Sequence, residues 1–289
     1  MGSGNRIEAA LEVALARAES RSGPPLLAQA LRHAVFPGGQ RIRPRLCLSV
    51  AMACGDDMPV VTDAAAAAIE LLHCASLVHD DLPTFDNADT RRGKPTIHKA
   101  FNEPLAVLAG DALIVMAFQT LAKSVAAAPD RLAPLVEIYS EAVGAPNGIC
   151  AGQAWESEPT IDLVEYQRAK TGALFAAATE AGAAAAGHPH QAWRVLGEAL
   201  GEAYQIADDL RDVAADPEQL GKPVGQDATL GRPNAVQALG LKGAVGRLKR
   251  LVSAAVESIP ECPGRAPLQA AILEETGHFL PKELAQQAA

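Results

Sequence analysis

Two clusters of aspartates follow apolar stretches of this sequence. In the later cluster Asp208 and Asp212 are four residues apart, so on a helix their carboxylates share one face. In the earlier cluster Asp80 and Asp86 are six residues apart, about 240° around a straight helix, so their carboxylates diverge. Pro83 lies between them and predicts a break in the helix that returns Asp86 to the side of Asp80.

Several carboxylates on an apolar helix face repel one another and are costly to bury without a cation. Carboxylate oxygens without thiolates suit Mg²⁺, which typically binds one or two protein carboxylates and the oxygens of a phosphorylated substrate. Either cluster alone also fits an ordinary solvated helix end. Because both clusters follow apolar runs, we predict that together they form a magnesium site.

Four groups of basic residues are interleaved with these clusters, although 25 Lys and Arg against 34 Asp and Glu give the chain a formal net charge of −9. An anionic ligand must therefore be held by local cations against the field of the whole protein. Arginine pairs bidentately with phosphate, whereas lysine acts as a point charge. The pattern predicts a ligand with two or more phosphates bridged by Mg²⁺. The four groups are Gly38-Gly39-Gln40-Arg41-Ile42-Arg43-Pro44, Arg91-Arg92-Gly93-Lys94-Pro95, Lys170-Thr171-Gly172 and Gly221-Lys222-Pro223.

The elements that position these residues are expected to be helices. Alanine is abundant and aromatic residues make up 4% of the chain, which favours closely packed helices over β-sandwiches. No convincing period-2 strand and no linker is found, so we predict one all-α domain over residues 1–289. A nearly all-round apolar helix from Pro59 to about Leu82 is expected to be central. One more helix is expected to start near Ile7, and another to end before Pro37. The remaining expected helices cover 44–54, 104–127, 130–143, 160–186, 190–213, 233–258 and 265–276.

Composition excludes several classes of protein. An isoelectric point near 5.3 argues against binding to nucleic acid. The most apolar runs are interrupted by charged residues or histidine, so we expect no membrane insertion, and no secretory leader opens the chain. The five cysteines include no C-x-x-C pair and are expected to be reduced thiols, mostly in the core. We therefore expect a soluble, cytoplasmic protein.

The ordered set of motifs resembles the trans-isoprenyl diphosphate synthases, also called polyprenyl synthetases. The two Asp-rich motifs, the G-G-x-R-x-R-P turn, R-R-G, K-T-G and G-K match that family in order and spacing over residues 30–235. The stretch from Glu70 to His98 is most similar to bacterial farnesyl and geranylgeranyl diphosphate synthases. The resemblance implies an isoprenoid-synthase-type bundle of about ten or more helices around a central cavity, usually as a homodimer.

The resemblance also implies a role for each matched residue. The metal ligands would be Asp80, Asp86 and Asp208, helped by Asp81 and Asp212, around a trinuclear Mg²⁺ cluster. The allylic diphosphate (dimethylallyl, geranyl or farnesyl) would be held by Arg91, Lys170, Thr171, Gln205 and Lys222. Isopentenyl diphosphate would be held by Arg43, His73 and Arg92. The sequence departs from the family at Gln40, where lysine is common, and this departure removes a positive charge from the isopentenyl diphosphate site.

The implied reaction is the head-to-tail condensation of isopentenyl diphosphate with an allylic diphosphate. With Mg²⁺ bound, the allylic diphosphate becomes a leaving group. The double bond of isopentenyl diphosphate then attacks the allylic cation, and the released diphosphate can take the proton. Apolar helix walls exclude water, which would quench the cation.

Product length is expected to depend on the helix that ends at Asp80. Ala75 and Ser76 lie about one turn deeper, and both are small, whereas farnesyl-making relatives have an aromatic residue close by. We therefore expect the twenty-carbon product geranylgeranyl diphosphate, with farnesyl diphosphate as the alternative. Growth would stop at bulkier residues further on, namely Leu71, Leu72, Met116 and Phe118.

Three other readings leave part of the pattern unexplained. The pair His79-Asp80 also occurs in HD-type metal phosphohydrolases, but that reading leaves Asp86 and the second Asp-rich motif without a role. A class I terpene cyclase would mix Asn, Ser and Glu in its second metal motif, whereas this chain has aspartates there. A non-catalytic partner subunit of another prenyl synthase would commonly lose one Asp-rich motif, and this chain keeps both.

Overall fold

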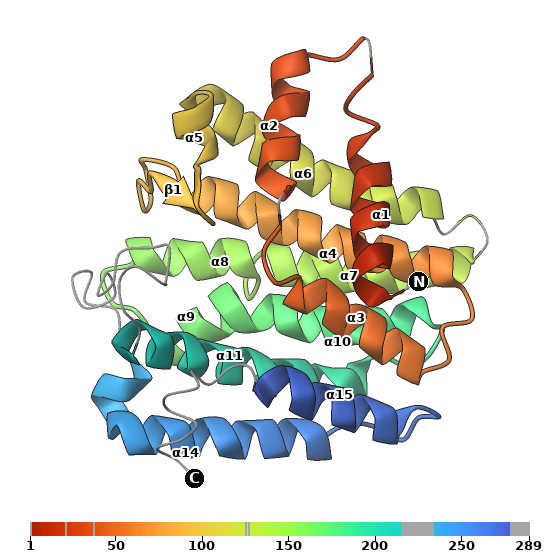
Figure 1. Ribbon diagram of the computed structural model, residues 1–289, viewed down its shortest axis with the longest axis vertical. Helices are drawn as coiled ribbons and strands as arrows, with labels where there is room; N and C mark the ends of the chain where they lie inside the picture. The colour runs from red at the N-terminus through yellow and green to blue at the C-terminus, as the bar shows by residue number, and fades with distance from the viewer. Residues whose placement is uncertain are drawn as a thin grey trace.

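The computed structural model describes residues 2–20, 22–36, 38–124, 126, 128–214 and 234–277, with the side chains of residues 212–214 excepted. These residues are mostly helical, so the predicted all-α fold class is confirmed. Figure 1 shows the long helices stacked in rows across the molecule, with the two N-terminal helices crossing them steeply at one end.

The N-terminal helices are α1 (Ser3–Leu15), α2 (Pro25–Val35) and α3 (Ile42–Ala53). The first buries one face through the apolar side chains that the sequence spacing marks out, Ile7, Leu11, Ala14 and Leu15. Proline begins α2, where the missing N–H has no helical partner to lose. Pro44 lies in the first turn of α3, as predicted.

The core is built around α4 (Pro59–Asp80), α6 (Glu103–Ser124) and α10 (Ala173–Ala185). Both α4 and α6 are long and apolar enough to cross a membrane by length and composition alone. The apolar stretch of α4 is 72% buried, as in a core helix, whereas that of α6 is 44% buried. One face of α6 is therefore left uncovered.

Small residues let these helices approach closely. The alanine-rich patches at 64–68 and 183–186 are buried between neighbouring helices, as predicted. On α10, a Cβ atom at Gly182 would lie 2.4 Å from the carbonyl oxygen of Cys47 in α3. A larger residue there would force the two helices apart.

The helix predicted over 160–186 is continuous from 163 to 185, but the sequence did not predict the π-helical turn within it. The structure has α9 (Leu163–Gln167), a π-helical turn at Arg168–Gly172, and then α10. A π turn shifts the register of a helix, but residues 173–186, which follow it, are almost all small or apolar, so the apolar period shows no shift.

The prediction of no strands is wrong in one place. A short antiparallel hairpin pairs β1 (Thr90–Arg91) with β2 (Lys94–Pro95), and two residue pairs are too short to give an alternating pattern. The remaining elements are α5 (Ile97–Ala100), η2 (Pro129–Arg131), α7 (Leu132–Val143), α8 (Ile149–Ala154), η3 (Trp155–Ser157), η5 (Gln191–Trp193), α11 (Arg194–Ala214), α14 (Ala235–Glu257) and α15 (Arg265–Gly277).

Candidate active site

The first aspartate cluster lies where α4 ends. Asp80 is its last residue, and Pro83 falls in the turn that follows. The backbone N–H of Asp86 donates to the carbonyl oxygen of Asp80 at 3.0 Å, so the chain folds back as the sequence predicts. Burial raises the pKa of the Asp80 carboxyl, while the Lys170 ammonium opposes this rise and the Asp86 carboxylate adds to it. The two carboxylates therefore share one electrostatic site.

His79 joins the end of α4 to α6. The imidazole Nε2 donates to the carbonyl oxygen of Val107 at 3.2 Å. The ring lies so close to Gly110 that a Cβ atom there would be 2.0 Å from Nε2. This contact positions the turn that carries Asp80 and gives His79 a structural partner, which does not favour the HD-type reading.

The β1–β2 hairpin places Arg91 against the same cluster. Arg92 and Gly93 have positive φ angles of 54° and 75°, as the central residues of a type I′ hairpin turn do. Arg91 Nε donates to Asp81 Oδ1 at 3.0 Å, and its Nη2 lies 3.9 Å from Asp80 Oδ2. Burial raises the pKa of the Asp81 carboxyl, and the Arg91 guanidinium opposes that rise. Arg91 thus faces both members of the aspartate pair.

Lys170 lies in the π-helical turn and reaches the first cluster from the other side. Its Nζ donates to Glu156 Oε1 at 2.6 Å and lies 3.4 Å from Asp80 Oδ1. The Tyr166 hydroxyl donates to the same glutamate oxygen at 2.7 Å. Sequence reasoning missed Glu156, because one glutamate in a short polar stretch carries no spacing signal.

The next residue of this turn contacts the helix of the second cluster. The Thr171 hydroxyl donates to Gln205 Oε1 at 3.1 Å, and Gln205 precedes Asp208 by one helical turn. Gln205 Nε2 donates to Asp209 Oδ1 at 3.1 Å, and Asp209 Oδ2 accepts the backbone N–H of Ala235 at 2.7 Å. Asp209, also missed as a site residue, therefore joins α11 to the start of α14.

A single π-helical turn thus contacts both helices that carry aspartates. Figure 1 shows α4 and α11 ending on the same side of the molecule. Asp208 lies 3.3 Å from Arg211 in an ion pair within α11. The side chain of Asp212, and the whole of Lys222, lie outside the described residues, so the structure does not test their predicted roles.

The three residues expected to hold isopentenyl diphosphate meet beside α4. Arg43 Nη1 donates to His73 Nε2 at 3.4 Å, and the Arg43 guanidinium lies 4.7 Å from the centre of the Phe175 ring. Burial, together with the charges of Arg43 and Arg92, lowers the pKa of His73 well below its usual value. The Nε of Arg43 is buried without a protein partner. The cations gathered here make this part of the protein suitable for an anionic ligand.

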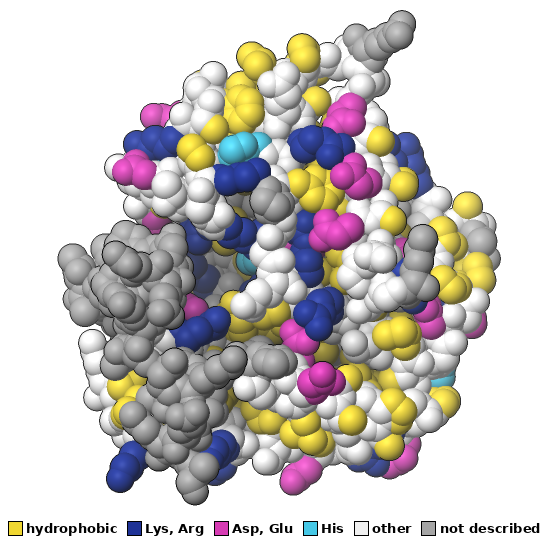
Figure 2. Space-filling model, viewed as in Figure 1, with side chains coloured by type: hydrophobic (Ala, Val, Ile, Leu, Met, Phe, Trp, Pro, Cys, Tyr) yellow, Lys and Arg dark blue, Asp and Glu magenta, His cyan; other side chains and the backbone are white. Residues whose placement is uncertain are grey.

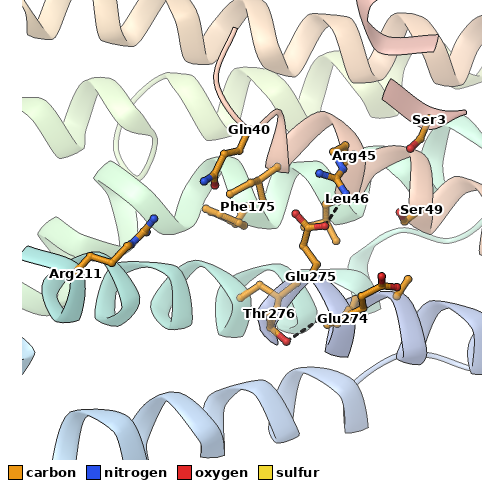
Figure 3. A pocket seen from close by; sticks show the side chains of 14 residues that line it. Ser3, Gln40, Arg45, Leu46, Ser49, Phe175, Arg211, Glu274, Glu275 and Thr276 are labelled. Carbon is orange, nitrogen blue, oxygen red and sulfur yellow. Dashed lines mark hydrogen bonds and ion pairs between the residues drawn. The ribbon is translucent and has the colours of Figure 1, made fainter. Parts of the chain in front are cut away.

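A cavity of about 560 Å³ opens beside this basic group, between α3, α10, α11 and α15 (Figure 3). Gln40 lies at its edge and points toward Phe175, the ring against which Arg43 stacks. Figure 2 shows a hollow in this face of the molecule with Lys and Arg side chains gathered around it. The net acidic chain therefore presents a local positive surface at the candidate site.

The expected chain-length residues lie on the helices that pack below the site. Ala75 in α4 is only 1% exposed, whereas Ser76 is partly exposed and its hydroxyl donates to the carbonyl oxygen of His73. Phe118 of α6 is partly buried and packs against the main core. Of the two small residues, Ala75 is therefore packed inside the protein and Ser76 is the more accessible.

The carboxylates fit a hard divalent cation, although Asp80, Asp81 and Asp208 are each paired here with a cation of the protein. Among the described residues, no group of three or more His, Cys, Asp or Glu is gathered closely enough to hold a metal. Asp80 faces Lys170, and Asp81 faces Arg91. The oxygen-only donor set and the return of Asp86 to Asp80 suit Mg²⁺.

Comparison with known proteins agrees with this geometry. The sequence model of the polyprenyl synthetase family matches residues 24–266. The chain is 56% identical to a geranylgeranyl diphosphate synthase of Cereibacter sphaeroides over 280 residues, covering 97% of both chains. It is 58% identical to that of Rhodobacter capsulatus over 263 residues, covering 91% of each. A geranyltransferase from Legionella pneumophila has a similar solved structure, with a TM-score of 0.80 and 29% identity over 96% of this chain and 93% of that one. This chain belongs to the polyprenyl synthetase family.

Proposed function

We propose that this protein condenses isopentenyl diphosphate with allylic diphosphates and releases mainly geranylgeranyl diphosphate. The observation that carries the proposal is the π-helical turn Arg168–Gly172. Through Lys170 it contacts the first aspartate cluster, and through Thr171 it contacts the helix of the second. The identity of 56% and 58% to two geranylgeranyl diphosphate synthases supports the same activity and product.

Mg²⁺ is the proposed cofactor. The ligands would be Asp80, Asp86 and Asp208, with help from Asp81 and Asp212. When bound, a trinuclear Mg²⁺ cluster would neutralise the allylic diphosphate and make it a better leaving group.

The residues of the chain bind and orient the two substrates. Arg91, Lys170, Thr171 and Gln205, with Lys222, would hold the allylic diphosphate, while Arg43, His73 and Arg92 would hold isopentenyl diphosphate. Burial and the nearby arginines lower the pKa of His73 and so favour its neutral form, which can donate a hydrogen bond to a phosphate without adding charge. The allylic C–O bond breaks and its electron pair leaves with the diphosphate. The double bond of isopentenyl diphosphate attacks the allylic cation to form the new C–C bond, and the tertiary cation that results loses a proton from C2 to the released diphosphate. The buried apolar walls of α4 and α6 keep water from the cation.

The protein is proposed to act as a homodimer in the cytoplasm. On α6, Val107, Leu108 and Val115 are 43%, 53% and 59% exposed, and a second copy would cover them. All five cysteines are free, which suits a reducing compartment. A monomeric mass in light scattering would contradict the dimer.

Product analysis tests the proposed function. Purified protein is incubated with Mg²⁺, isopentenyl diphosphate and dimethylallyl, geranyl or farnesyl diphosphate in turn, and the products are sized. We expect a twenty-carbon product from each primer, and none from Asp80→Asn, which keeps the size of the side chain but not its charge. A fifteen-carbon product would indicate a farnesyl diphosphate synthase. No product from any primer would overturn the proposal in favour of a non-catalytic partner subunit.

A further inference from the structure

Arg41 belongs to the same basic turn as Arg43 but has a different environment. It is the N-terminal cap of α3, has a φ of 52°, and is 7% exposed. Its guanidinium donates to Glu70 Oε1 at 2.6 Å, to Glu8 Oε1 at 2.9 Å and to the carbonyl oxygen of Val35 at 2.9 Å. These partners occupy the guanidinium within the protein, so Arg41 is directed away from any ligand.

The principal partner of Arg41 is the buried carboxylate of Glu70. Glu70 is 2% exposed and also accepts the Cys74 thiol at 3.9 Å. It lies on α4 three residues before His73, and residues three apart on a helix share a face. Removing either member of a buried ion pair leaves an uncompensated charge, which is strongly unfavourable. The pair therefore holds the basic turn to α4 within one helical turn of His73.

Gly38 provides the space for this arrangement. A Cβ atom at Gly38 would lie 2.0 Å from Arg41 Cζ, so alanine there would displace the guanidinium. Gly39 stands in the same relation to Arg92, since a Cβ atom there would lie 2.8 Å from Arg92 Nε. Each glycine of the pair thus makes room for one arginine.

We propose that Arg41 and Glu70 are positioning residues for the isopentenyl diphosphate site. Arg43 is two residues beyond Arg41, and its Nη1 lies 3.4 Å from His73 while its Nε is buried without a protein partner. The Arg41–Glu70 pair sets the distance between Arg43 and His73, and Glu8 couples it to helix α1. This inference rests on the proposed function, in which Arg43 and His73 bind isopentenyl diphosphate.

Steady-state kinetics with each substrate varied in turn tests the inference. Arg41→Lys keeps the charge but loses the planar fork, so we expect the KM for isopentenyl diphosphate to rise about tenfold. The KM for the allylic substrate and kcat should stay within about twofold, because Arg41 touches neither reacting group. Glu70→Gln should give the same split, and the double variant should be no worse than either single variant, since they disrupt one pair.

Arg6→Lys is the matched control. Arg6 also ties α1 to the body of the protein, with its Nε 2.7 Å from Asp63 and its Nη1 2.9 Å from Asp56. Asp63 is ten residues before His73, about 15 Å along α4, so this variant should lower Tm without changing either KM. If Arg41→Lys does not fold, Gly38→Ala displaces the same guanidinium with every charge retained.

Three outcomes would overturn the inference. One is an unchanged KM for isopentenyl diphosphate in Arg41→Lys, Glu70→Gln and Gly38→Ala. The second is a rise in the KM values for both substrates. The third is a lower Tm with unchanged kinetics, as expected for the control. Each of these two outcomes would show that Arg41 and Glu70 have only a structural role. Arg43→Ala separates the two proposals. If it raises the KM for isopentenyl diphosphate while the positioning variants do not, only the inference fails. If it leaves that KM unchanged, the proposed substrate site itself is wrong.

Discussion

At the scale of single residues, Asp80 is the aspartate that several parts of the candidate site approach. It ends α4, lies within reach of Lys170 and Arg91, and is close to Asp86. Its partners come from an adjacent hairpin, a following turn and a distant π-helical turn. A change at this residue therefore affects the site from several directions at once.

We expect Asp80→Ala or Asp208→Ala to lower kcat by about 10³-fold or more, because each removes a proposed ligand of the ion that stabilises the leaving group. Steady-state turnover at saturating substrates and Mg²⁺ measures the effect. Asp89→Ala is a matched control, since Asp89 is an exposed aspartate near the same cluster that pairs only with Lys99 among the ion pairs of the described residues. Near-normal turnover in both site variants would contradict the mechanism.

Gln40 lies at the edge of the cavity beside Phe175, close to the expected isopentenyl diphosphate site (Figure 3). Gln40→Lys should lower the KM for isopentenyl diphosphate by up to about fivefold, since an exposed ion pair contributes up to about 1 kcal/mol. The KM for the allylic substrate should not change. Gln40→Met, of similar length and uncharged, is the control. An effect confined to the allylic substrate would show that the two pockets are assigned the wrong way round.

Glu180 is expected to make the stability of the protein depend on pH. Burial raises the pKa of this carboxyl to about 7, opposed by Arg194 and reinforced by Glu141. The folded state binds the proton more tightly than the unfolded state, whose glutamate titrates near 4.5. Stability contributed by the neutral form is therefore lost as pH rises from about 4.5 to about 7, and is constant above that range.

Glu180→Gln should remove this loss and raise stability at pH 8 by on the order of 1–2 kcal/mol. Denaturant unfolding at pH 5.5 and pH 8 measures the difference. Glu141→Gln removes the other carboxylate that pairs with Arg194, and it should change the profile little because that side chain is 60% exposed. An unchanged pH profile in Glu180→Gln would show that another group is responsible.

At the scale of elements, we expect the close contact of α4 with its neighbours to limit how far the substrate tail can extend. Ser76→Phe should fill the passage one turn below Asp80 and shorten the main product from twenty to fifteen carbons. Ala75→Phe should act in the same way but also lower stability by about 1–3 kcal/mol, because Ala75 is fully packed. Product sizing and thermal unfolding separate the two effects. Ser76→Ala is the control, because it keeps the passage open and should retain the twenty-carbon product. An unchanged product in both Phe variants would show that this stretch does not determine product length.

At the scale of the whole molecule, we expect the ends of α4 and α11 and the π-helical turn between them to form one site that a ligand would hold together. Mg²⁺ with a non-reactive diphosphate analogue should stabilise the protein by about 2.7 kcal/mol at one hundred times the Kd. Either component alone should have much less effect, since the metal and the diphosphate complete each other's coordination. Thermal shift measures this synergy, and Asp80→Asn should abolish it. Equal stabilisation by Mg²⁺ alone would contradict a shared site.

Much of the architecture follows from local chemistry, which is why sequence predicts it. The apolar period of α1, the proline that begins α2, and the nearly all-round apolar character of α4 each act within a few turns of one helix. The end of α4 also has a local cause in Pro83, since a proline breaks a helix whatever the helix packs against. The return of Asp86 to Asp80 could therefore be predicted before any tertiary contact was known.

By itself, then, the sequence determined the helical class, the two aspartate clusters and the order of the basic motifs, because each depends on residue type and short spacing. Only the tertiary structure decided which member of a motif is paired within the protein and which is not. Arg41 and Arg43 are two residues apart and chemically identical, yet one is buried against Glu70 and the other keeps a donor without a protein partner. Glu156 and Asp209 enter the site through contacts with elements distant in sequence. Such pairings depend on which helices pack together, and a linear pattern does not contain that information.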